Sequence, residues 1–335
     1  MRIIQHLTIS IFLFTFLLFY QTSYAFEKRT EKVSSAEASK FSKAQLSLEK
    51  IHHNRQERSY YLHLPNDLPH NRKPATNLPL ILVLHGGGKA DGDETAKHTG
   101  YNTLADKHGF IVAYPNGLNA QWNDGRGKTY RNTNNASTDD VGFISVLIDT
   151  LIRDYKADAN RVYVTGLSNG GMMTLRLGCE LSSKLAAIAP VIANIPQNII
   201  GKCKPDSPLP VLIMNGTNDP LVPWNGGDVK FFRKKMGKVV STRETVKFWV
   251  KHNQCNPVPS RRAVPNTDKT DHSKIVVTTY SCRNKNNEVV LYAVHGGGHA
   301  FPGSNTRDLP RILGRKNKDI KGADVIWKFF KRHSR

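Results

Sequence analysis

The sequence predicts an α/β fold, in which a mostly parallel sheet carries helices on both faces. Three observations lead to this prediction. From about residue 58 onwards, short apolar runs alternate with helical patterns, which is typical of a parallel sheet covered on both sides. Residues 80–84 are apolar at every position, as in a central strand that is buried on both faces. Hydrophobic residues make up 39% and charged residues 22% of the 335 residues, ordinary values for a folded domain.

The expected elements follow in order along the chain. Residues 59–64 form an entry strand, and a polar, proline-containing loop follows at 65–77. The clearest helix spans residues 141–155, because its apolar residues recur on one face and Asp139 and Asp140 suit a helix N-terminus. The other expected strands are residues 80–84, 110–114, 161–165, 186–192, 211–214, 275–280 and 289–294, and the other expected helices are residues 103–108, 170–181, 241–252 and 323–331.

The first 25 residues have the pattern of a secretory signal peptide. Arg2 is their only charged side chain, residues 9–20 form an apolar run, and small residues stand at Ser23 and Ala25. Cleavage is expected after Ala25, which predicts a secreted or periplasmic protein. A membrane anchor is the alternative, but the apolar run is short for about 30 Å of hydrocarbon. No later segment is apolar for long enough to span a bilayer.

Residues 26–57 are expected to be a basic, polar leader outside the folded domain. They are rich in Lys, Ser, Glu and Ala and contain no Gly or Pro. A weak surface helix and a floppy segment fit this composition equally well. One catalytic domain is therefore expected at residues 58–335.

An exported chain meets oxidising conditions, which favours disulfides for its four cysteines. Four cysteines allow three pairings, and the sequence leaves them open. Pairing of neighbours would close two loops of about 25 residues, each worth about 3 kcal/mol in the chain-entropy account. A zinc site would need close-spaced pairs, and the chain has none. The cysteines are Cys179, Cys203, Cys255 and Cys282.

The chain is strongly basic, with 48 Lys and Arg against 27 Asp and Glu and a formal charge of +21. Loss of Arg2 with the signal peptide leaves +20. Such a charge is expected to attract the protein to anionic surfaces such as lipid headgroups, acidic polysaccharide or nucleic acid. The basic residues are scattered and no nucleic-acid module is recognisable, so specific nucleic-acid binding is not expected.

The strongest local motif is Gly166-Leu167-Ser168-Asn169-Gly170, between an expected strand and an expected helix. This G-x-S-x-G turn is the nucleophile elbow of the α/β-hydrolase fold, where a strained turn exposes the serine hydroxyl and the flanking glycines avoid clashes. The sequence context of strand and helix supports Ser168 as a nucleophile.

A nucleophilic serine needs a base and an orienting acid, which follow it in the order acid, then histidine in this fold. Asp219 comes after the apolar run 211–214 in a Gly- and Asn-containing loop, and Asp228 is its nearest competitor. His299 follows the last expected strand and three glycines, whereas His295 still belongs to the strand end. Asp219 and His299 are therefore the preferred partners of Ser168.

Backbone N–H groups must stabilise the negative charge that develops on the substrate oxygen. His85-Gly86-Gly87-Gly88 follows the central strand, and its glycines allow close approach of the backbone to substrate. Gly87 is expected to supply one donor, with Gly86 as the alternative. Asn169, the residue after the nucleophile, is expected to supply the other.

These motifs together resemble the esterase family that contains polyhydroxybutyrate depolymerases, feruloyl esterases and related carbohydrate esterases. The likeness runs from about Arg58 to the C-terminus. It rests on Leu84-His85-Gly86, Trp122-Asn123, Asp139-Asp140-Val141-Gly142-Phe143, Gly166-Leu167-Ser168-Asn169-Gly170-Gly171, Asn215-Gly216-Thr217-Asn218-Asp219, Val222-Pro223-Trp224-Asn225-Gly226-Gly227 and Gly296-Gly297-Gly298-His299-Ala300-Phe301-Pro302-Gly303.

The resemblance implies that Ser168, Asp219 and His299 are nucleophile, acid and base, and that Trp122 and Trp224 are walls of a substrate pocket. Both tryptophans could equally be core or rim aromatics. Phe301 stands where the family usually has Trp and is expected to line the pocket as well, but whether that part of the pocket holds the acyl or the alcohol group stays open. The chain shows no Ser/Thr-rich linker or added binding domain of the kind found in extracellular polymer degraders.

The sequence therefore predicts hydrolysis of a carboxylic ester through an acyl-enzyme, without a metal or organic cofactor. The expected substrate is a hydroxyalkanoate ester or a sugar-linked aromatic or acetyl ester. Two other functions stay open: a cell-envelope binding protein that keeps the hydrolase scaffold, and a serine peptidase of the same fold.

Overall fold

The computed structural model describes residues 46–66, 77–88, 90–127 and 137–335. The predicted signal peptide and residues 26–45 of the predicted leader lie outside the described residues. Residues 47–335 form one compact unit, and the fold described below is that of this unit.

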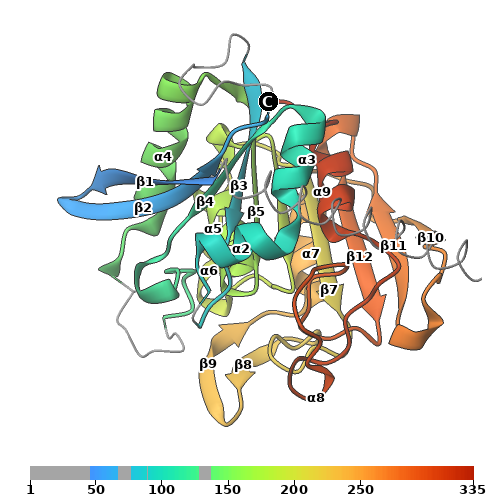
Figure 1. Cartoon of the computed structure of the whole chain (residues 1–335). Coiled ribbons are helices and arrows are strands. Elements are labelled where there is room, and N and C mark those ends of the chain that lie inside the picture. The colour runs from blue at the N-terminus through green and yellow to red at the C-terminus, as the bar shows by residue number, and fades with distance from the viewer. Residues whose placement is uncertain (1–45, 67–76, 89, 128–136) are drawn as a thin grey trace, which may run out of the picture. The chain divides into compact units, whose positions relative to one another are not determined.

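The core of the unit is a ten-stranded sheet whose six middle strands are parallel (Figure 1). Toward one edge of the sheet β2 pairs antiparallel with β4, and toward the other edge β11 pairs antiparallel with both β12 and β10. The mostly parallel sheet predicted from the sequence is confirmed. In spatial order the strands are β1 (Leu46–His53), β2 (Gln56–His63), β4 (Ile111–Pro115), β3 (Leu78–Leu84), β5 (Ala157–Leu167), β6 (Ala187–Val191), β7 (Val211–Gly216), β12 (Val289–His295), β11 (Lys274–Tyr280) and β10 (Ser260–Ala263).

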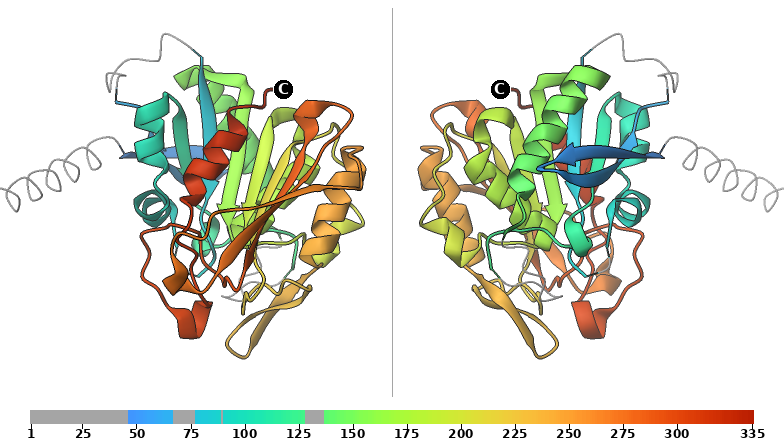
Figure 2. Two further views of the ribbon diagram at one scale, coloured as in Figure 1. Left: turned by 90° about the vertical axis from the view of Figure 1, so that its right-hand side faces the viewer. Right: turned by 90° about the vertical axis from the view of Figure 1, so that its left-hand side faces the viewer.

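Helices cover both faces of the sheet. Because side chains alternate between the faces along each strand, one strand contacts helices on both sides. On β5, Val162 and Val164 belong to a core cluster with residues of α4, α5 and α7. The intervening Tyr163 stacks on Phe330 of α9 at 4.8 Å between ring centres. Figure 2 shows α9 and α7 on opposite sides of the sheet. The helices are α2 (Gly92–Thr99), α3 (Tyr101–His108), α4 (Asp140–Tyr155), α5 (Asn169–Glu180), α6 (Gln197–Ile200), α7 (Thr242–His252), α8 (Pro310–Leu313) and α9 (Gly322–Phe330).

Helix α4 illustrates how closely local sequence sets an element. Its N-cap Asp139 accepts a hydrogen bond from the Gly142 N–H, as expected for a carboxylate at a helix N-terminus. The predicted apolar face packs against the core, fully buried in its first three turns and half-buried at Ile152 and Tyr155. Asp140 is the first residue of the helix, as expected, and also has a tertiary role, because its buried carboxylate lies 2.7 Å from the Arg58 guanidinium and accepts the Asn123 N–H.

The predicted domain start at Arg58 is wrong. Strand β1 lies wholly within the predicted leader, and β2 begins at Gln56. Ile51 of β1 packs against the core, while most of the strand's other side chains are more exposed. This amphipathic strand at the outside of the sheet has a polar composition, which made it resemble a leader. The sequence patterns also did not predict α2, α6, α8, β10 or the hairpin of β8 (Gly227–Phe231) and β9 (Lys234–Val239).

The four cysteines form two disulfides, Cys179–Cys203 and Cys255–Cys282. This is the pairing of neighbours, one of the three that the sequence allowed. The first disulfide links the end of α5 to the segment after α6, and the second links the segment after α7 to the segment after β11. Within the described part of the chain, no helix has the length and apolar character needed to cross a membrane.

Candidate active site

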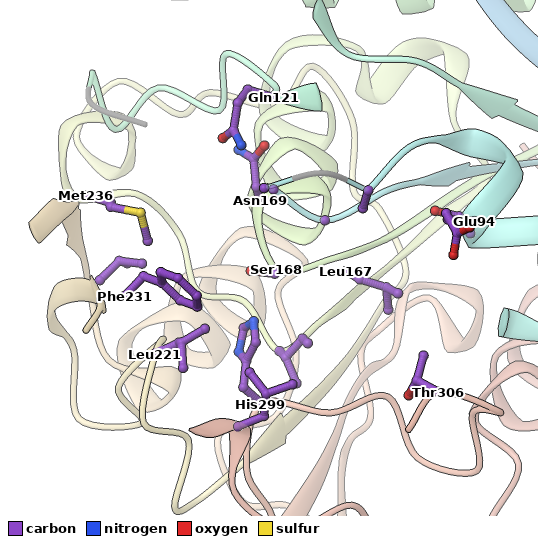
Figure 3. A pocket seen from close by; sticks show the side chains of 18 of the residues that line it. Glu94, Gln121, Leu167, Ser168, Asn169, Leu221, Phe231, Met236, His299 and Thr306 are labelled. Carbon is purple, nitrogen blue, oxygen red and sulfur yellow. The ribbon is translucent and has the colours of Figure 1, made fainter. Parts of the chain in front are cut away.

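Ser168 stands alone between the end of β5 at Leu167 and the start of α5 at Asn169. Its backbone has φ 55° and ψ −113°, a combination that non-glycine residues adopt only at a cost of about 1–3 kcal/mol. The Ser168 N–H donates to the carbonyl of Val191 at 3.0 Å, which helps to hold this conformation. In this strained conformation the Ser168 side chain points away from both β5 and α5 and into a cavity (Figure 3).

The glycines on either side of Ser168 are required by close backbone contacts. A Cβ on Gly166 would lie 2.4 Å from the carbonyl oxygen of Gly170, and a Cβ on Gly170 would lie 2.4 Å from that of His85. Real Cβ atoms do not come so close to a backbone oxygen. The turn therefore needs G-x-S-x-G, and the nucleophile elbow predicted from the sequence has its expected geometry.

Asp219 and His299 meet at the carboxyl end of the parallel strands. Asp219 follows β7 and His299 follows β12, two neighbouring strands. The Nδ1 atom of His299 lies 2.8 Å from the Oδ2 atom of Asp219, and only 8% and 2% of the two side chains are exposed. The other carboxylate oxygen of Asp219 accepts the N–H groups of Leu221 and Val222, both at 2.8 Å. The carboxylate is thus fixed on both sides.

The two competitors lie elsewhere. Asp228 is half-buried and pairs with the exposed Lys235 at 3.1 Å, and His295 is exposed at the end of β12. With Nδ1 of His299 facing Asp219, the far side of the imidazole is turned toward Ser168 (Figure 3). Both Ser168 and His299 line the same cavity. The geometry therefore brings together the three residues that sequence order selected.

His85 organises the glycine loop that faces Ser168. Its Nε2 accepts the N–H of Gly117 at 2.9 Å, so the proton of the neutral ring is on Nδ1, which donates to the Gly86 carbonyl at 2.6 Å. Burial lowers the pKa of His85 to about 4, which keeps the ring neutral near pH 7. In a trans peptide the C=O and the next N–H point in opposite directions. The Gly87 N–H is thereby aimed away from His85.

Gly87 and Asn169 lie side by side in the cavity wall. A Cβ on Gly87 would be 3.5 Å from the Asn169 Cβ, and both residues line the cavity with Ser168. The Asn169 N–H belongs to the first turn of α5, where N–H groups lack intrahelical partners. Two backbone donors from different segments can therefore point to one place, as an oxyanion site requires.

A buried polar network supports Asn169, and sequence reasoning missed it. The side-chain amide of Asn169 donates to Asp124 at 2.6 Å and to the Trp122 carbonyl at 3.1 Å, and its oxygen accepts the Trp122 N–H at 2.8 Å. Asp124 in turn lies 2.7 Å from the Arg126 guanidinium. Asp124 directly follows the Trp122-Asn123 pair, so its position next to a family motif was the available signal.

The three aromatic residues predicted as pocket walls do not line the cavity, and this prediction is corrected. Trp122 is fully buried behind the glycine loop, with its Nε1–H donating to the His85 carbonyl at 3.0 Å. Phe301 packs on Gly322 at the start of α9. Trp224 is partly exposed and is not among the residues that line the cavity, and its carbonyl accepts the Thr242 N–H. The reason is geometric, since position in a motif does not tell which way a side chain points.

The cavity itself has a volume of about 840 Å³ and two chemically different sides. In Figure 3, Leu221, Phe231 and Met236 lie on one side of Ser168, and Glu94, Thr306 and one apolar residue, Leu167, lie on the other. Near Glu94, helix α2 adds further polar groups to the wall. The described residues that line the cavity include Gly86, Gly87, Glu94, Thr95, His98, Thr99, Gln121, Arg126, Leu167, Ser168, Asn169, Ile192, Leu221, Val229, Phe231, Met236, His299, Thr306 and Leu313.

The chain is similar in sequence to known esterases. Residues 58–195 match the family described as "Esterase PHB depolymerase". A protein of Nocardia uniformis subsp. tsuyamanensis with the name "Putative esterase NocK" is 31% identical over 259 residues, which are 75% of this chain and 73% of that protein. Feruloyl esterase B of Piromyces equi is 31% identical over 230 residues, or 66% of this chain, but the match spans only 39% of that longer protein.

The fold is also similar to that of a solved esterase. An acetyl xylan esterase from Aspergillus awamori superposes with a TM-score of 0.54 over 85% of this chain and 99% of that chain, at 18% sequence identity. At this identity the likeness shows the fold alone. It confirms the α/β-hydrolase fold that the elbow motif predicted.

Proposed function

The chain belongs to the PHB depolymerase family of esterases and is an ester-hydrolysing enzyme, and we propose that Ser168, His299 and Asp219 are its nucleophile, base and orienting acid. The observation that carries this proposal is the positive φ of Ser168 at the tip of a strand–helix turn. Ser168 lines the same cavity as His299, whose imidazole is hydrogen-bonded to the buried carboxylate of Asp219.

In the proposed acylation step, Nε2 of His299 takes the proton of Ser168 while Oγ attacks the ester carbonyl. Asp219 holds the imidazole in the tautomer with its proton on Nδ1 and stabilises the cation that forms. The negative charge on the carbonyl oxygen is stabilised by the N–H groups of Gly87 and Asn169. His299 then gives its proton to the leaving alcohol, which leaves the acyl group on Ser168.

In the proposed deacylation step, His299 takes a proton from water, and the water oxygen attacks the acyl-enzyme carbonyl. The same two N–H groups stabilise the second tetrahedral intermediate. Collapse of this intermediate returns the proton to Ser168 and releases the acid. No atom is needed beyond the ester, one water molecule and these residues.

The cavity supports a proposal for the substrate. The side with Leu221, Phe231 and Met236 suits an apolar or aromatic part of the ester, while the side with Glu94 and Thr306 suits hydroxyl groups. We therefore propose an ester that joins an apolar acyl group to a hydroxylated partner. Feruloyl or acetyl sugar esters and hydroxyalkanoate oligomers are the candidates within this class.

We propose that the protein acts outside the cytoplasm, in the periplasm or the medium, after cleavage at Ala25. The two disulfides support this location, because disulfides persist in oxidising compartments. Amino-terminal sequencing of the exported protein tests the cleavage site. A mature chain that still begins at Met1 would contradict this proposal.

The function is tested with short p-nitrophenyl esters, feruloyl esters, hydroxybutyrate oligomers and peptides. Ser168→Ala is expected to lower kcat for the best ester by about 10⁴-fold or more. Ser281→Ala, at an exposed position away from the cavity, is the matched control and keeps wild-type activity. Activity that survives Ser168→Ala would contradict the mechanism. Cleavage of peptides alone would favour a peptidase, and no turnover of any substrate would favour a binding protein.

A further inference from the structure

Two segments flank the mouth of the cavity and project beyond it. One is the β8–β9 hairpin, which contributes Phe231 and Met236 to the wall, and the other is residues 304–315 around α8, which contributes Thr306 and Leu313. Figures 1 and 2 show both segments projecting at the end of the molecule to which the parallel strands point. Residues 227–239 and 304–315 are together called the rim below.

The rim exposes large apolar side chains. Phe232 at the hairpin tip is 74% exposed, Leu309 39% and Ile312 43%. In the described part of the chain only two other large hydrophobic residues are as exposed, Leu48 and Val258. Three of these five side chains therefore gather on two short segments next to one opening, which is unusual for scattered surface residues.

The same segments are rich in cations. The hairpin residues 227–239 carry five Lys and Arg residues against one Asp, and residues 304–315 carry three Arg residues against one Asp. Each of the two carboxylates is paired with a lysine, Asp228 with Lys235 and Asp308 with Lys316. Neither carboxylate pairs with the exposed arginines Arg233, Arg307 and Arg311. The charges of these arginines are therefore available to a binding partner.

We propose that the rim docks on an anionic lipid membrane, with Phe232, Leu309 and Ile312 entering the headgroup region and the arginines binding lipid phosphates. This combination of protruding apolar side chains and surrounding cations is what interfacial membrane binding requires. Docking in this way turns the cavity mouth toward the lipid surface. The interaction uses the outside of the rim and does not depend on the chemistry of Ser168.

An acidic polysaccharide would match the charge of the rim but not its apolar residues. Carboxylated sugar chains are hydrated, and they offer no apolar medium for the aliphatic side chains of Leu309 and Ile312. A membrane interface offers both an anionic surface and an apolar layer within 5–10 Å of it. The membrane is therefore the partner that accounts for both features.

The test is sedimentation of the purified mature protein with vesicles of phosphatidylcholine alone or in an equal mixture with phosphatidylglycerol. The anionic vesicles are expected to bind about tenfold more tightly or better. Replacing Phe232, Leu309 and Ile312 by Ser is expected to weaken binding by about tenfold. The double variant Leu48→Ser/Val258→Ser is the matched control, since it removes exposed apolar residues outside the rim, and it should bind like wild type.

The contribution of charge is tested with Arg233, Arg307 and Arg311 changed to Gln. The control changes Arg55, Arg261 and Arg283 to Gln, which removes the same charge at exposed positions elsewhere. Only the rim variant is expected to lose binding. Hydrolysis of a soluble p-nitrophenyl ester by each rim variant and each control variant checks that its fold is intact. Ser168→Ala, which is expected to lose hydrolysis, should still bind vesicles like wild type.

Insertion is measured with an environment-sensitive fluorophore on Phe232→Cys, whose emission should shift to the blue on anionic vesicles, unlike that of Leu48→Cys. Equal loss of binding in the rim and control arginine variants would overturn the proposal in favour of net charge. Binding to polygalacturonate that the triple Ser variant leaves unchanged, without vesicle binding, would overturn it in favour of a polysaccharide. Absence of vesicle binding would overturn it outright.

Discussion

At the scale of single residues, Asp124 is the site residue whose role the sequence did not reveal. Asp124→Asn is expected to lower kcat by about 10- to 100-fold with a smaller change in KM, because the carboxylate orients the Asn169 side chain beside the proposed oxyanion donor. The measurement is steady-state kinetics on a p-nitrophenyl ester.

The control for this prediction is Asp140→Asn, which weakens a second buried pair, with Arg58, at the same 2.7 Å distance. Both variants lose stability, since a buried arginine is left without its countercharge. Only Asp124→Asn should lose kcat disproportionately. Equal kinetic losses in the two variants would show that Asp124 acts through stability alone.

His85 links the geometry of the glycine loop to pH. Its folded pKa of about 4 lies below the value of about 6.5 in an unfolded chain. The neutral ring therefore contributes stability that is fully present above pH 6.5 and is lost as the pH falls toward 4. Between pH 7.5 and 4.5 the loss from this group is expected to be about 2–3 kcal/mol.

Urea unfolding of the wild type and of His85→Asn at these two pH values measures the contribution. The free energy of unfolding of the variant should be lower at pH 7.5 but should fall less between the two pH values. Parallel curves for the two proteins would contradict the assigned neutral, Nδ1-protonated ring. Activity of the variant should also be reduced, because the Gly86 carbonyl loses its donor.

At the scale of elements, the β8–β9 hairpin supplies the apolar side of the cavity through Phe231 and Met236. Phe231→Ala/Met236→Ala is expected to lower kcat/KM for feruloyl or long acyl esters by about 10- to 200-fold, with little change for acetyl esters. Phe232→Ala, the exposed neighbour outside the cavity wall, is the control. A uniform loss over all esters would indicate that the hairpin acts on the catalytic groups rather than on the acyl group.

Strands β1 and β2 extend the folded domain beyond its predicted start. A chain that begins at Arg58 lacks β1 and the hydrogen bond of 2.8 Å between His53 and the N-cap Asp139. Its Tm is expected to be several degrees lower than that of a chain beginning at Leu46, since about 1 kcal/mol corresponds to a few degrees in a domain of this size. Equal Tm values for the two chains would show that β1 adds nothing to stability.

At the scale of the whole molecule, the disulfides join segments that lie 24 and 27 residues apart in the chain. Removing either pair as a double Ala variant is expected to cost about 3 kcal/mol of unfolding free energy through the unfolded state. Thermal unfolding with and without reductant checks this. Each double variant lacks one disulfide, so reductant should destabilise it less than it destabilises the wild type. An equal destabilisation by reductant in a variant and the wild type would contradict the pairing.

The sequence by itself determined the parallel sheet, most of its helices and the three proposed catalytic residues. These features depend on local signals, because strand and helix periods, the elbow glycines and the order of Ser168, Asp219 and His299 are all written along the chain. The order was sufficient because neighbouring parallel strands end at one edge of the sheet, and each residue follows such a strand.

Only the tertiary structure decided which residues surround the proposed catalytic centre. Trp122 lies behind the glycine loop, Asp124 beneath Asn169, and Phe231 in the cavity wall. Each of these positions depends on how a loop from one part of the chain packs against a distant element. Such packing sets the direction of a side chain, which no local period records, and it likewise decided which cysteines meet and that β1 joins the sheet.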